Sequence, residues 1–490
     1  MKNISANLTN LRLSDSRDRI AYQFQDASLT FGDIWTKTRQ AASWLKEQGV
    51  LPRQLVVFSV EDSLEWPIFF HGLLLLGAIP VVVNPALPTE NIKRIVSKVN
   101  VDIAIVDQFS ITKLESVTQP KLNIANIDLA NYPFFDNFYK YNPKDISFIL
   151  STSGTTGGNK LIAHSQENLE SALLDSNPYQ FTQDSVILCP ARMSFVYGLI
   201  IHVFGVLASG AQSIILKGKN DLGRIHEIAN EKKATHLFGG PYLVKLLLNH
   251  NRFKFEPHLK YVFSGSEPLP SSAETNFYNK FNIPLIQLYG NSETLKWALF
   301  INTPNNPRPG SIGLPDLNVQ CRVVNQEGQL CQPNEHGVLW VQCGTEAMCY
   351  YGDEFLTKEN FKDSWYNTND IVYFDDDGYY FYVSRANQLA KINSCWVNVI
   401  DVEKLVENLP GVSNCVVVID TDEHGFNKSV AYVVSEPKSS TASVRSALTQ
   451  QRTPGHLIPG TVVPVNSIPV TVTNKKLRSP EELRNSVAAL

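Results

Sequence analysis

The chain has 490 residues, of which 43% are hydrophobic and 18% are charged. This balance indicates an ordered globular protein with more than one domain. Its 43 Lys and Arg residues against 47 Asp and Glu residues give a net charge of -4, so there is no bulk basic field of the kind that indicates nucleic acid or an anionic membrane as partner. Small molecules are therefore the expected ligands.

The seven cysteines are scattered and form no CxxC pair, so we expect reduced thiols in a cytoplasmic protein. The N-terminal segment lacks the apolar core of an export signal. The most apolar stretch, residues 66–83, is interrupted by two prolines and two glycines, which disfavours a membrane span.

Helical and strand patterns alternate through the first two-thirds of the chain. The patterns predict helices at residues 29–49 and 65–76, and strands at residues 54–60, 79–83, 104–106, 146–151, 185–189, 213–216, 236–238 and 261–264. Such alternation favours an α/β fold of helix-covered sheets, whose strands carry ligand-binding loops at their C-terminal ends.

The pattern changes after residue 319. Short β-type runs at residues 320–324, 337–341, 371–374 and 379–383 indicate a β-rich subdomain. Beyond residue 385, helical patterns at residues 399–408 and 440–450 and strand patterns at residues 414–420 and 429–434 indicate a small α+β domain. We therefore expect an N-terminal domain of residues 1–385 and a C-terminal domain of residues 386–490.

One loop carries an indication of chemistry. The strand-like run at residues 148–150 leads directly into STSGTTGGNK, residues 151–160. Glycines let backbone N–H groups turn toward an anion, and the hydroxyls and the lysine add donors for phosphate oxygens. The spacing is not that of a Walker A motif. A flexible surface linker is the alternative, but the preceding buried-type strand argues against it.

The segment STSGTTGGNKLIAHS, residues 151–165, resembles the signature loop of the adenylate-forming superfamily, which includes acyl- and aryl-CoA ligases, luciferases and the adenylation domains of nonribosomal peptide synthetases. Asn159 stands where that family usually has Pro. Further segments are similar to family motifs in the same chain order, namely residues 264–270, 287–294, 308–315, 365–370, 384–391 and 469–478. Each alone is weak, and their shared order makes coincidence improbable.

The resemblance implies an enzyme that binds ATP and Mg²⁺. The implied nucleotide-binding residues are Ser151, Thr152, Ser153, Gly154, Thr155, Thr156, Lys160, Ser264, Gly265, Ser266, Glu267, Tyr289, Gly290, Asn291, Ser292, Asp370 and Arg385. By resemblance, Tyr289 would stack on adenine and Asp370 would accept hydrogen bonds from the ribose hydroxyls.

The resemblance also implies three catalytic residues. Glu293 and Thr156 would hold the metal, and Lys475 would bridge the substrate carboxylate and the α-phosphate. The neighbouring Lys476 leaves the register of the lysine ambiguous. An ordinary solvated basic cluster is the alternative for this segment.

The pocket segment 193–199 has no Asp where amino-acid-activating domains place one, which disfavours an α-amino acid. The segment is similar to the FFxYG motif of benzoate- and anthranilate-CoA ligases, which implies a flat aryl acid. The predicted acid contacts are Phe195, Val196, Tyr197, Phe238, Gly239, Gly240, Gly290, Lys296 and Trp297. Core packing is the alternative for the aromatic residues. Lys296 either pairs with a ring substituent or lies at the surface.

In this family the C-terminal domain is mobile, and Asn387 would be its hinge. Asn369, Ser384, Asn387 and Ser394 depart from the family pattern. We therefore favour the phosphopantetheine of a carrier protein as acceptor over free CoA. Fatty-acyl activation and a catalytically silent acid- or nucleotide-binding relative are further alternatives.

Overall fold

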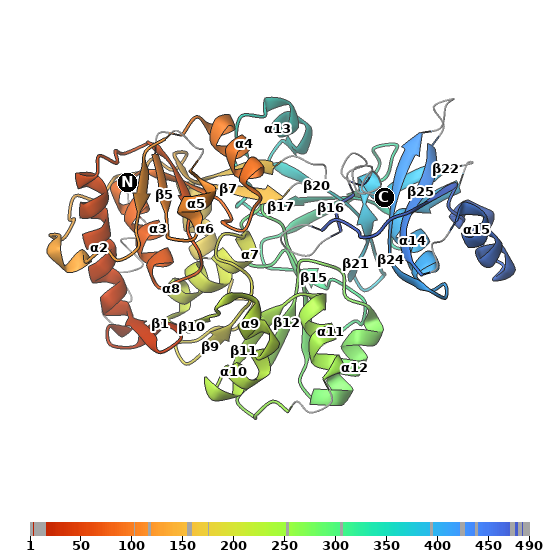
Figure 1. Cartoon of the computed structure of the whole chain (residues 1–490), viewed down its shortest axis with the longest axis horizontal. Coiled ribbons are helices and arrows are strands. Elements are labelled where there is room, and N and C mark those ends of the chain that lie inside the picture. Colours follow the sequence, from red (N-terminus) through yellow and green to blue (C-terminus); the bar gives the residue numbers. More distant parts are fainter. Residues whose placement is uncertain are drawn as a thin grey trace.

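The computed structural model describes residue 3 and residues 16–101, 103–115, 119–153, 159–174, 176–250, 254–303, 307–392, 395–421, 427–436, 440–470, 476–478 and 483. A large N-terminal part and a small C-terminal part lie side by side along the long axis of the molecule (Figure 1).

A seven-stranded sheet forms one half of the large part. In spatial order its strands are β18 (Cys349–Tyr350), β8 (Asn159–Ser165), β7 (Ile146–Ser153), β4 (Ile79–Val82), β3 (Leu55–Ser59), β5 (Ile103–Val106) and β6 (Lys121–Asn123). Strands β7, β4, β3, β5 and β6 run parallel, and β8 returns antiparallel beside β7. The predicted phosphate loop therefore connects two adjacent strands.

A nine-stranded sheet forms the other half. In spatial order its strands are β15 (Leu314–Pro315), β14 (Phe300–Ile301), β13 (Leu285–Tyr289), β12 (Tyr261–Ser264), β11 (His236–Gly239), β9 (Val186–Leu188), β10 (Gln212–Ile215), β1 (Ile20–Phe24) and β2 (Ala27–Thr30). The six strands from β13 to β1 are parallel.

Helices cover both sheets. In chain order they are α2 (Phe31–Glu47), α3 (Glu65–Leu76), α4 (Thr89–Val99), α5 (Ser110–Lys113), η1 (Leu129–Asn131), α6 (Gln166–Leu173), α7 (Val196–Gly198), the π-helix η2 (Leu199–Phe204), α8 (Gly205–Ser209), α9 (Gly218–Gly223), α10 (Ile225–Glu231), α11 (Pro241–Asn249) and α12 (Ser271–Phe281). Helix α4 packs on the outer face of the seven-stranded sheet, and α10, α11 and α12 pack on the outer face of the nine-stranded sheet.

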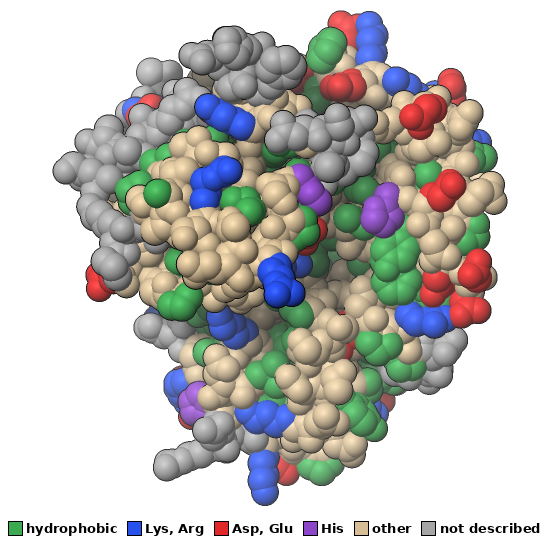
Figure 2. Space-filling view, turned by 90° about the vertical axis from the view of Figure 1, so that its right-hand side faces the viewer, with side chains coloured by type: hydrophobic (Ala, Val, Ile, Leu, Met, Phe, Trp, Pro, Cys, Tyr) green, Lys and Arg blue, Asp and Glu red, His purple; other side chains and the backbone are tan. Residues whose placement is uncertain are grey.

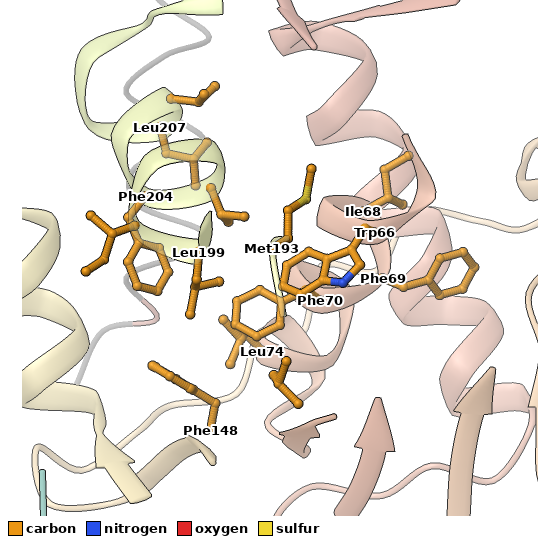
Figure 3. Packing of buried hydrophobic residues seen from close by; sticks show 14 of the residues in the cluster. Trp66, Ile68, Phe69, Phe70, Leu74, Phe148, Met193, Leu199, Phe204 and Leu207 are labelled. Carbon is orange, nitrogen blue, oxygen red and sulfur yellow. The ribbon is translucent and has the colours of Figure 1, made fainter. Parts of the chain in front are cut away.

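The main core lies between the two sheets and is built around α3. Every residue of α3 except Glu65 is buried, as expected of a helix that is apolar on all sides. Figure 3 shows Trp66 and Phe70 of α3 facing Leu199 and Phe204 of the π-helix. The helix ends at Gly77, whose φ of 85° is left-handed and where an added Cβ would meet the Tyr139 ring at 2.2 Å.

A five-stranded sheet follows, in the order β16 (Gln320–Val324), β17 (Gly337–Gln342), β20 (Trp365–Phe374) and β19 (Phe361–Lys362), with β21 (Tyr380–Arg385) also paired to β20. Helix α13 (Glu354–Asn360) precedes β19. The C-terminal part contains η3 (Ala386–Gln388), β22 (Leu389–Ile392), β23 (Cys395–Asn398), α14 (Val399–Glu407), β24 (Val412–Thr421), β25 (Asn427–Ser435), α15 (Thr441–Gln450), η4 (Gly455–Leu457) and β26 (Thr461–Pro464). It has its own core around Val402, Val417 and Ala431.

The predicted α/β fold with a β-rich subdomain is confirmed, and α3 has the predicted bounds. The helix expected at residues 29–49 begins later, at Phe31, because Thr30 and Asp33 form a capping box. Residues before it form the β1–β2 hairpin, which the sequence did not indicate. Strand β21 ends at Arg385, while the division into domains at residues 385 and 386 remains a prediction.

None of the helices in the described ranges is long and apolar enough to cross a bilayer. On the face that carries the C-terminal part, acidic and basic side chains are interspersed among other side chains (Figure 2).

Candidate active site

Three parallel strands end side by side and carry most of the predicted ligand-binding residues. Gly239 of β11 pairs with Ser264 of β12, which pairs with Gln287 of β13. The loops after these strands hold Gly240 and residues 265–267 and 290–293. Because the C-terminal ends of parallel strands meet at one edge, these segments adjoin one another.

Unpartnered polar groups mark this edge as a site for a polar ligand. Among the described residues, no hydrogen-bond partner is found for the hydroxyls of Tyr197 and Ser264 or for the side-chain amide of Asn291. Buried polar atoms normally have partners, so each of these groups calls for an explanation. Glu267 is exposed, and Ser266 has a left-handed φ of 73°. The carbonyl of Ser292 lies 2.9 Å from His164 Nε2.

Glu293 belongs to a buried polar chain that reaches the other sheet. The Tyr350 hydroxyl donates to Glu293 Oε1 at 2.9 Å, and the Lys160 ammonium lies 4.9 Å from the centre of the Tyr350 ring. Lys160 pairs with Thr152 across β7 and β8. Burial and the Glu293 carboxylate raise the pKa of Tyr350, so its hydroxyl stays a donor.

Asp370 and Arg385 meet on neighbouring strands, β20 and β21. Asp370 Oδ1 pairs with Arg385 Nε at 2.8 Å, and Asp370 Oδ2 accepts from the Tyr289 hydroxyl at 2.5 Å. The carboxylate raises the pKa of Arg385, and burial with Asp370 raises that of Tyr289. Asp370 therefore contacts two other residues that are predicted to hold the nucleotide.

The predicted acid pocket is brought together in part. Tyr197 lies edge-on to Phe238, with ring centres 6.2 Å apart. A Cβ added to Gly265 would lie 3.5 Å from the Tyr197 hydroxyl oxygen, whereas one on Gly290 would meet nothing closer than 4.0 Å. Glycines thus leave space beside the aromatic rings. Phe195 and Val196, at the start of α7, are half-buried.

Asp62 ties the loop before Phe195 to the loop after β3. Its Oδ1 accepts from the Met193 backbone N–H at 3.0 Å, and the neighbouring Arg192 pairs with Glu61. Burial raises the pKa of Asp62 to about 7, and Arg192 opposes the rise. Asp62 was not predicted from the sequence, since no local signal connects it to residues about 130 positions later.

Lys296 does not lie at the surface, which was one of the two expectations. It is 3% exposed, and its ammonium lies 3.3 Å from Asp316 Oδ2. It lines a cavity of about 370 Å³. The other lining residues are Glu170, Ser171, Leu174, Ser176, Asn318, Cys343, Gly344 and Thr345. None of the other predicted acid contacts lines this cavity.

Trp297 also has a structural role. Its indole N–H donates to the Ala172 carbonyl at 2.8 Å, and its ring stacks on Tyr179 at 5.6 Å. It packs behind Tyr179, which lies edge-on to Phe238.

The Ser151 side chain links two neighbouring strands of the seven-stranded sheet. It is 4% exposed, and its hydroxyl donates to the Val82 carbonyl at 2.9 Å. Gly154, Thr155, Thr156, Ser394 and Lys475 lie outside the described residues, as do the side chains of Ser153 and Asn387.

Two departures from the family pattern fit their positions. Asn369 has a left-handed φ of 56°, which Asn tolerates better than most residues, and its amide donates to Asn360 Oδ1 at 2.5 Å. Ser384 is fully buried in β21.

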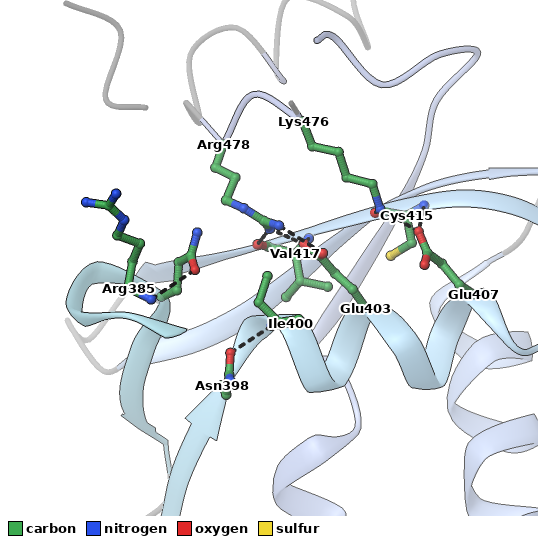
Figure 4. A network of polar contacts seen from close by, with 10 residues as sticks. Arg385, Asn398, Ile400, Glu403, Glu407, Cys415, Val417, Lys476 and Arg478 are labelled. Atoms are coloured by element: carbon green, nitrogen blue, oxygen red, sulfur yellow. Dashed lines mark hydrogen bonds and ion pairs between the residues drawn. The ribbon is translucent and has the colours of Figure 1, made fainter. Parts of the chain in front are cut away.

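The segment before the C-terminus is anchored to α14 (Figure 4). Lys476 donates to Glu407 and, at 2.6 Å, to the Cys415 carbonyl. Arg478 pairs with Glu403. Burial and Asp370 raise the pKa of Tyr382, whereas Arg385 and Arg478 oppose the rise.

The two helix-covered sheets and the polar groups at their strand ends agree with the class of enzyme that the sequence motifs indicate. The chain matches the family described as AMP-binding enzyme over residues 12–351, more than half of its length, and it therefore belongs to that family. This confirms the predicted class, an AMP-forming acid–thiol ligase.

Relatives extend the comparison. The chain is 28% identical over 481 residues to 4-coumarate–CoA ligase-like 6 from Arabidopsis thaliana, covering 90% of this chain and 83% of that protein. It is 25% identical over 482 residues to 3-hydroxybenzoate–CoA ligase from Aromatoleum sp. (strain CIB), covering 93% and 92%. The structure of the anthranilate CoA ligase AuaEII with anthranoyl-AMP matches with a TM-score of 0.84, at 23% identity over 100% of both chains.

Proposed function

We propose that this enzyme uses ATP to convert an aryl carboxylic acid of the benzoate, anthranilate or hydroxybenzoate type into its acyl-adenylate, and then transfers the acyl group to a phosphopantetheine thiol. The observation that carries the proposal is the meeting of Tyr289, Asp370 and Arg385 at the strand edge that also holds Tyr197 and Phe238. Two of the relatives named above, the 3-hydroxybenzoate–CoA ligase and the anthranilate CoA ligase, support an aryl acid.

In the first step an oxygen of the acid attacks the α-phosphorus of ATP. A new O–P bond forms, and the bond to pyrophosphate breaks. The protein positions the reactants and neutralises charge. Tyr289 would stack on adenine, Asp370 would accept from the ribose hydroxyls, and Lys475 would stabilise the charge between carboxylate and α-phosphate.

Glu293 is a suitable ligand for Mg²⁺. One of its oxygens is fixed by a neutral hydroxyl, and the ion pairs found in the described part of the chain do not include it. No cluster of three or more His, Cys, Asp or Glu side chains is placed to hold a metal within the ranges described. Mg²⁺ often relies on one carboxylate and on substrate phosphates. When bound, it neutralises phosphate charge; Thr156 would be its second protein ligand.

The thiol that accepts the acyl group belongs either to a carrier protein or to free CoA. The departures at Asn387 and Ser394 from the family pattern support a carrier protein. The relatives named as CoA ligases support free CoA instead. Thioester formation with CoA, and separately with phosphopantetheinylated carrier proteins, decides between the two acceptors.

Exchange of radiolabelled pyrophosphate into ATP tests the first step. We expect exchange with at least one of benzoate, anthranilate or a hydroxybenzoate and little with long-chain fatty acids. Exchange with fatty acids alone would show that the substrate is a fatty acid and not an aryl acid. Absence of exchange with every acid, together with intact ATP binding, would favour a catalytically silent relative.

Separate substitution of the adjacent residues Lys475 and Lys476 gives a second test of the same proposal. Lys475→Ala should lower the exchange rate by about 100-fold or more, because one charged donor to the transition state is worth several kcal/mol. Lys476→Ala should leave most of the rate, since Lys476 is bound by Glu407 and Cys415. Equal effects of the two substitutions would contradict this assignment.

A further inference from the structure

Tyr350 occupies an unusual position between two charged residues of the site. It lies on β18, at the edge of the seven-stranded sheet, and pairs with Ile162 of β8. The residue is 2% exposed and packs with Ile162 and Ala347. Neither the sequence motifs nor the comparisons give it a role.

The two ends of the Tyr350 side chain contact opposite charges. Its hydroxyl donates to Glu293 Oε1 at 2.9 Å, and its ring face supports the Lys160 ammonium at 4.9 Å. Glu293 and Lys160 come from different sheets, so only the tertiary fold brings both to one tyrosine.

These contacts have a physical consequence for an anionic ligand. A lysine and a carboxylate that pair directly cancel each other's charge and leave less attraction for a phosphate or a metal ion. A tyrosine between them contributes a neutral donor to the carboxylate and a negatively polarised ring face to the ammonium. Each group is therefore held in position by the tyrosine and not by the opposite charge.

We propose that Tyr350 is a positioning residue of the nucleotide site, which presents Glu293 and Lys160 as two separate, oriented charges to a magnesium-bound triphosphate. The inference rests on the proposed function, because it takes ATP with Mg²⁺ as the ligand. Glu293 is oriented through the hydroxyl and Lys160 through the ring, so substitutions can separate the two effects.

The test measures ATP binding by isothermal titration calorimetry, with Mg²⁺ and with excess EDTA. Tyr350→Phe keeps the ring under Lys160 and removes the donor to Glu293. We expect it to raise the dissociation constant about 10-fold in Mg²⁺, in line with the loss of one hydrogen bond to a charged group, and to leave the value in EDTA within about 2-fold. Tyr350→Leu removes the ring as well and should weaken binding in both conditions.

Tyr351→Phe is the matched control, because it removes a hydroxyl from the next residue of the chain. It should behave as wild type in both conditions. Thermal unfolding and circular dichroism check that each variant is folded. Tyr350→Phe should also raise the Mg²⁺ concentration that gives half-maximal pyrophosphate exchange, with kcat at saturating Mg²⁺ and KM for the acid nearly unchanged.

The outcomes separate this inference from the proposed function. If Tyr350→Phe binds ATP like wild type with and without Mg²⁺, Tyr350 has no positioning role. A wild-type enzyme that binds Mg²⁺–ATP but exchanges with no aryl acid would overturn the substrate proposal alone. A wild-type enzyme that binds no ATP would overturn both.

Discussion

Asp62 shows how burial changes the charge state of a side chain beside the predicted acid pocket. An Asp carboxyl in an unfolded chain has a pKa of about 3.9, and burial in this site raises it to about 7. The folded chain therefore binds the proton more tightly. The resulting contribution to stability is complete below pH 4 and is lost as the pH rises through about 7.

Asp62→Asn should be more stable than wild type at pH 8, by about 1–2 kcal/mol. The amide oxygen can still accept from Met193, and the charge is removed. This gain is smaller than a fully buried carboxylate would give, because Asp62 is partly exposed to solvent. The difference should shrink as the pH falls from 8 toward 4. Urea unfolding across this pH range measures it.

Asp26→Asn is the control, since Asp26 is exposed in the turn between β1 and β2. It should change stability little at any pH in this range. A stability difference for Asp62→Asn that does not vary with pH would show that the carboxyl is not titrating as expected.

At the scale of elements, the helix that follows the pocket loop is built in three pieces. Helix α7, the π-helix η2 and α8 run continuously from Val196 to Ser209. A π-turn inside a helix is often found at functional sites. The preceding loop folds back tightly: Phe195 N–H donates to the Arg192 carbonyl at 3.0 Å, and a Cβ on Gly198 would lie 2.0 Å from that carbonyl oxygen.

Gly198→Ala should therefore destabilise the protein by about 2–3 kcal/mol, because backbone on both sides of the clash has to move. The shift also displaces Phe195 and Tyr197, so KM for the acid should rise. Urea unfolding and the concentration dependence of exchange measure the two effects.

Gly223→Ala provides the comparison, because an added Cβ at Gly223 meets nothing within 4 Å. It should leave both stability and KM close to wild type. Similar losses for the two substitutions would mean that the close approach to Arg192 is not the cause.

At the scale of the whole molecule, ion pairs hold residues 476–478 against the C-terminal part. Arg478 contacts Glu403 through two nitrogens, with 3.0 Å from Nη2 to Oε2, and Glu403 Oε1 accepts from the Val417 N–H at 2.7 Å. The Glu403 side chain is 5% exposed. This pair ties the segment that follows Lys475 to α14.

Glu403→Ala leaves the Arg478 charge partly buried without its partner, which costs about 3 kcal/mol. We expect faster hydrogen exchange in α14, β24 and β25 and a lower rate of pyrophosphate exchange. ATP binding to the N-terminal part should change little. Hydrogen exchange with mass spectrometry and calorimetry measure these three quantities.

Lys404→Ala on the same helix is the control, because the Lys404 side chain is 69% exposed and its partner Asp401 is 54% exposed. Exposed pairs of this kind contribute about 0–1 kcal/mol. Equal hydrogen exchange in the two variants would argue that the loop is not anchored through Glu403.

Local patterns in the sequence determined the class of fold, many of the elements and the strand that leads into residues 151–160. The apolar run from Trp66 to Leu76, closed by Gly77, needs no distant residue to indicate a helix. Motif order likewise determined the family, because each motif is read within a few residues.

Only the tertiary structure decided which side chains meet. Tyr350 reaches Glu293 across 57 positions, Met193 reaches Asp62 across 131, and strand β1 pairs Tyr22 with Ser213. Lys296 is buried and pairs with Asp316, which no local pattern indicates. The physical reason is that helix caps, turns and hydrophobic periodicity depend on residues a few positions apart in the sequence. The burial, strand pairing and charge interactions of a side chain depend instead on segments that are far apart in the sequence and meet only in the folded protein.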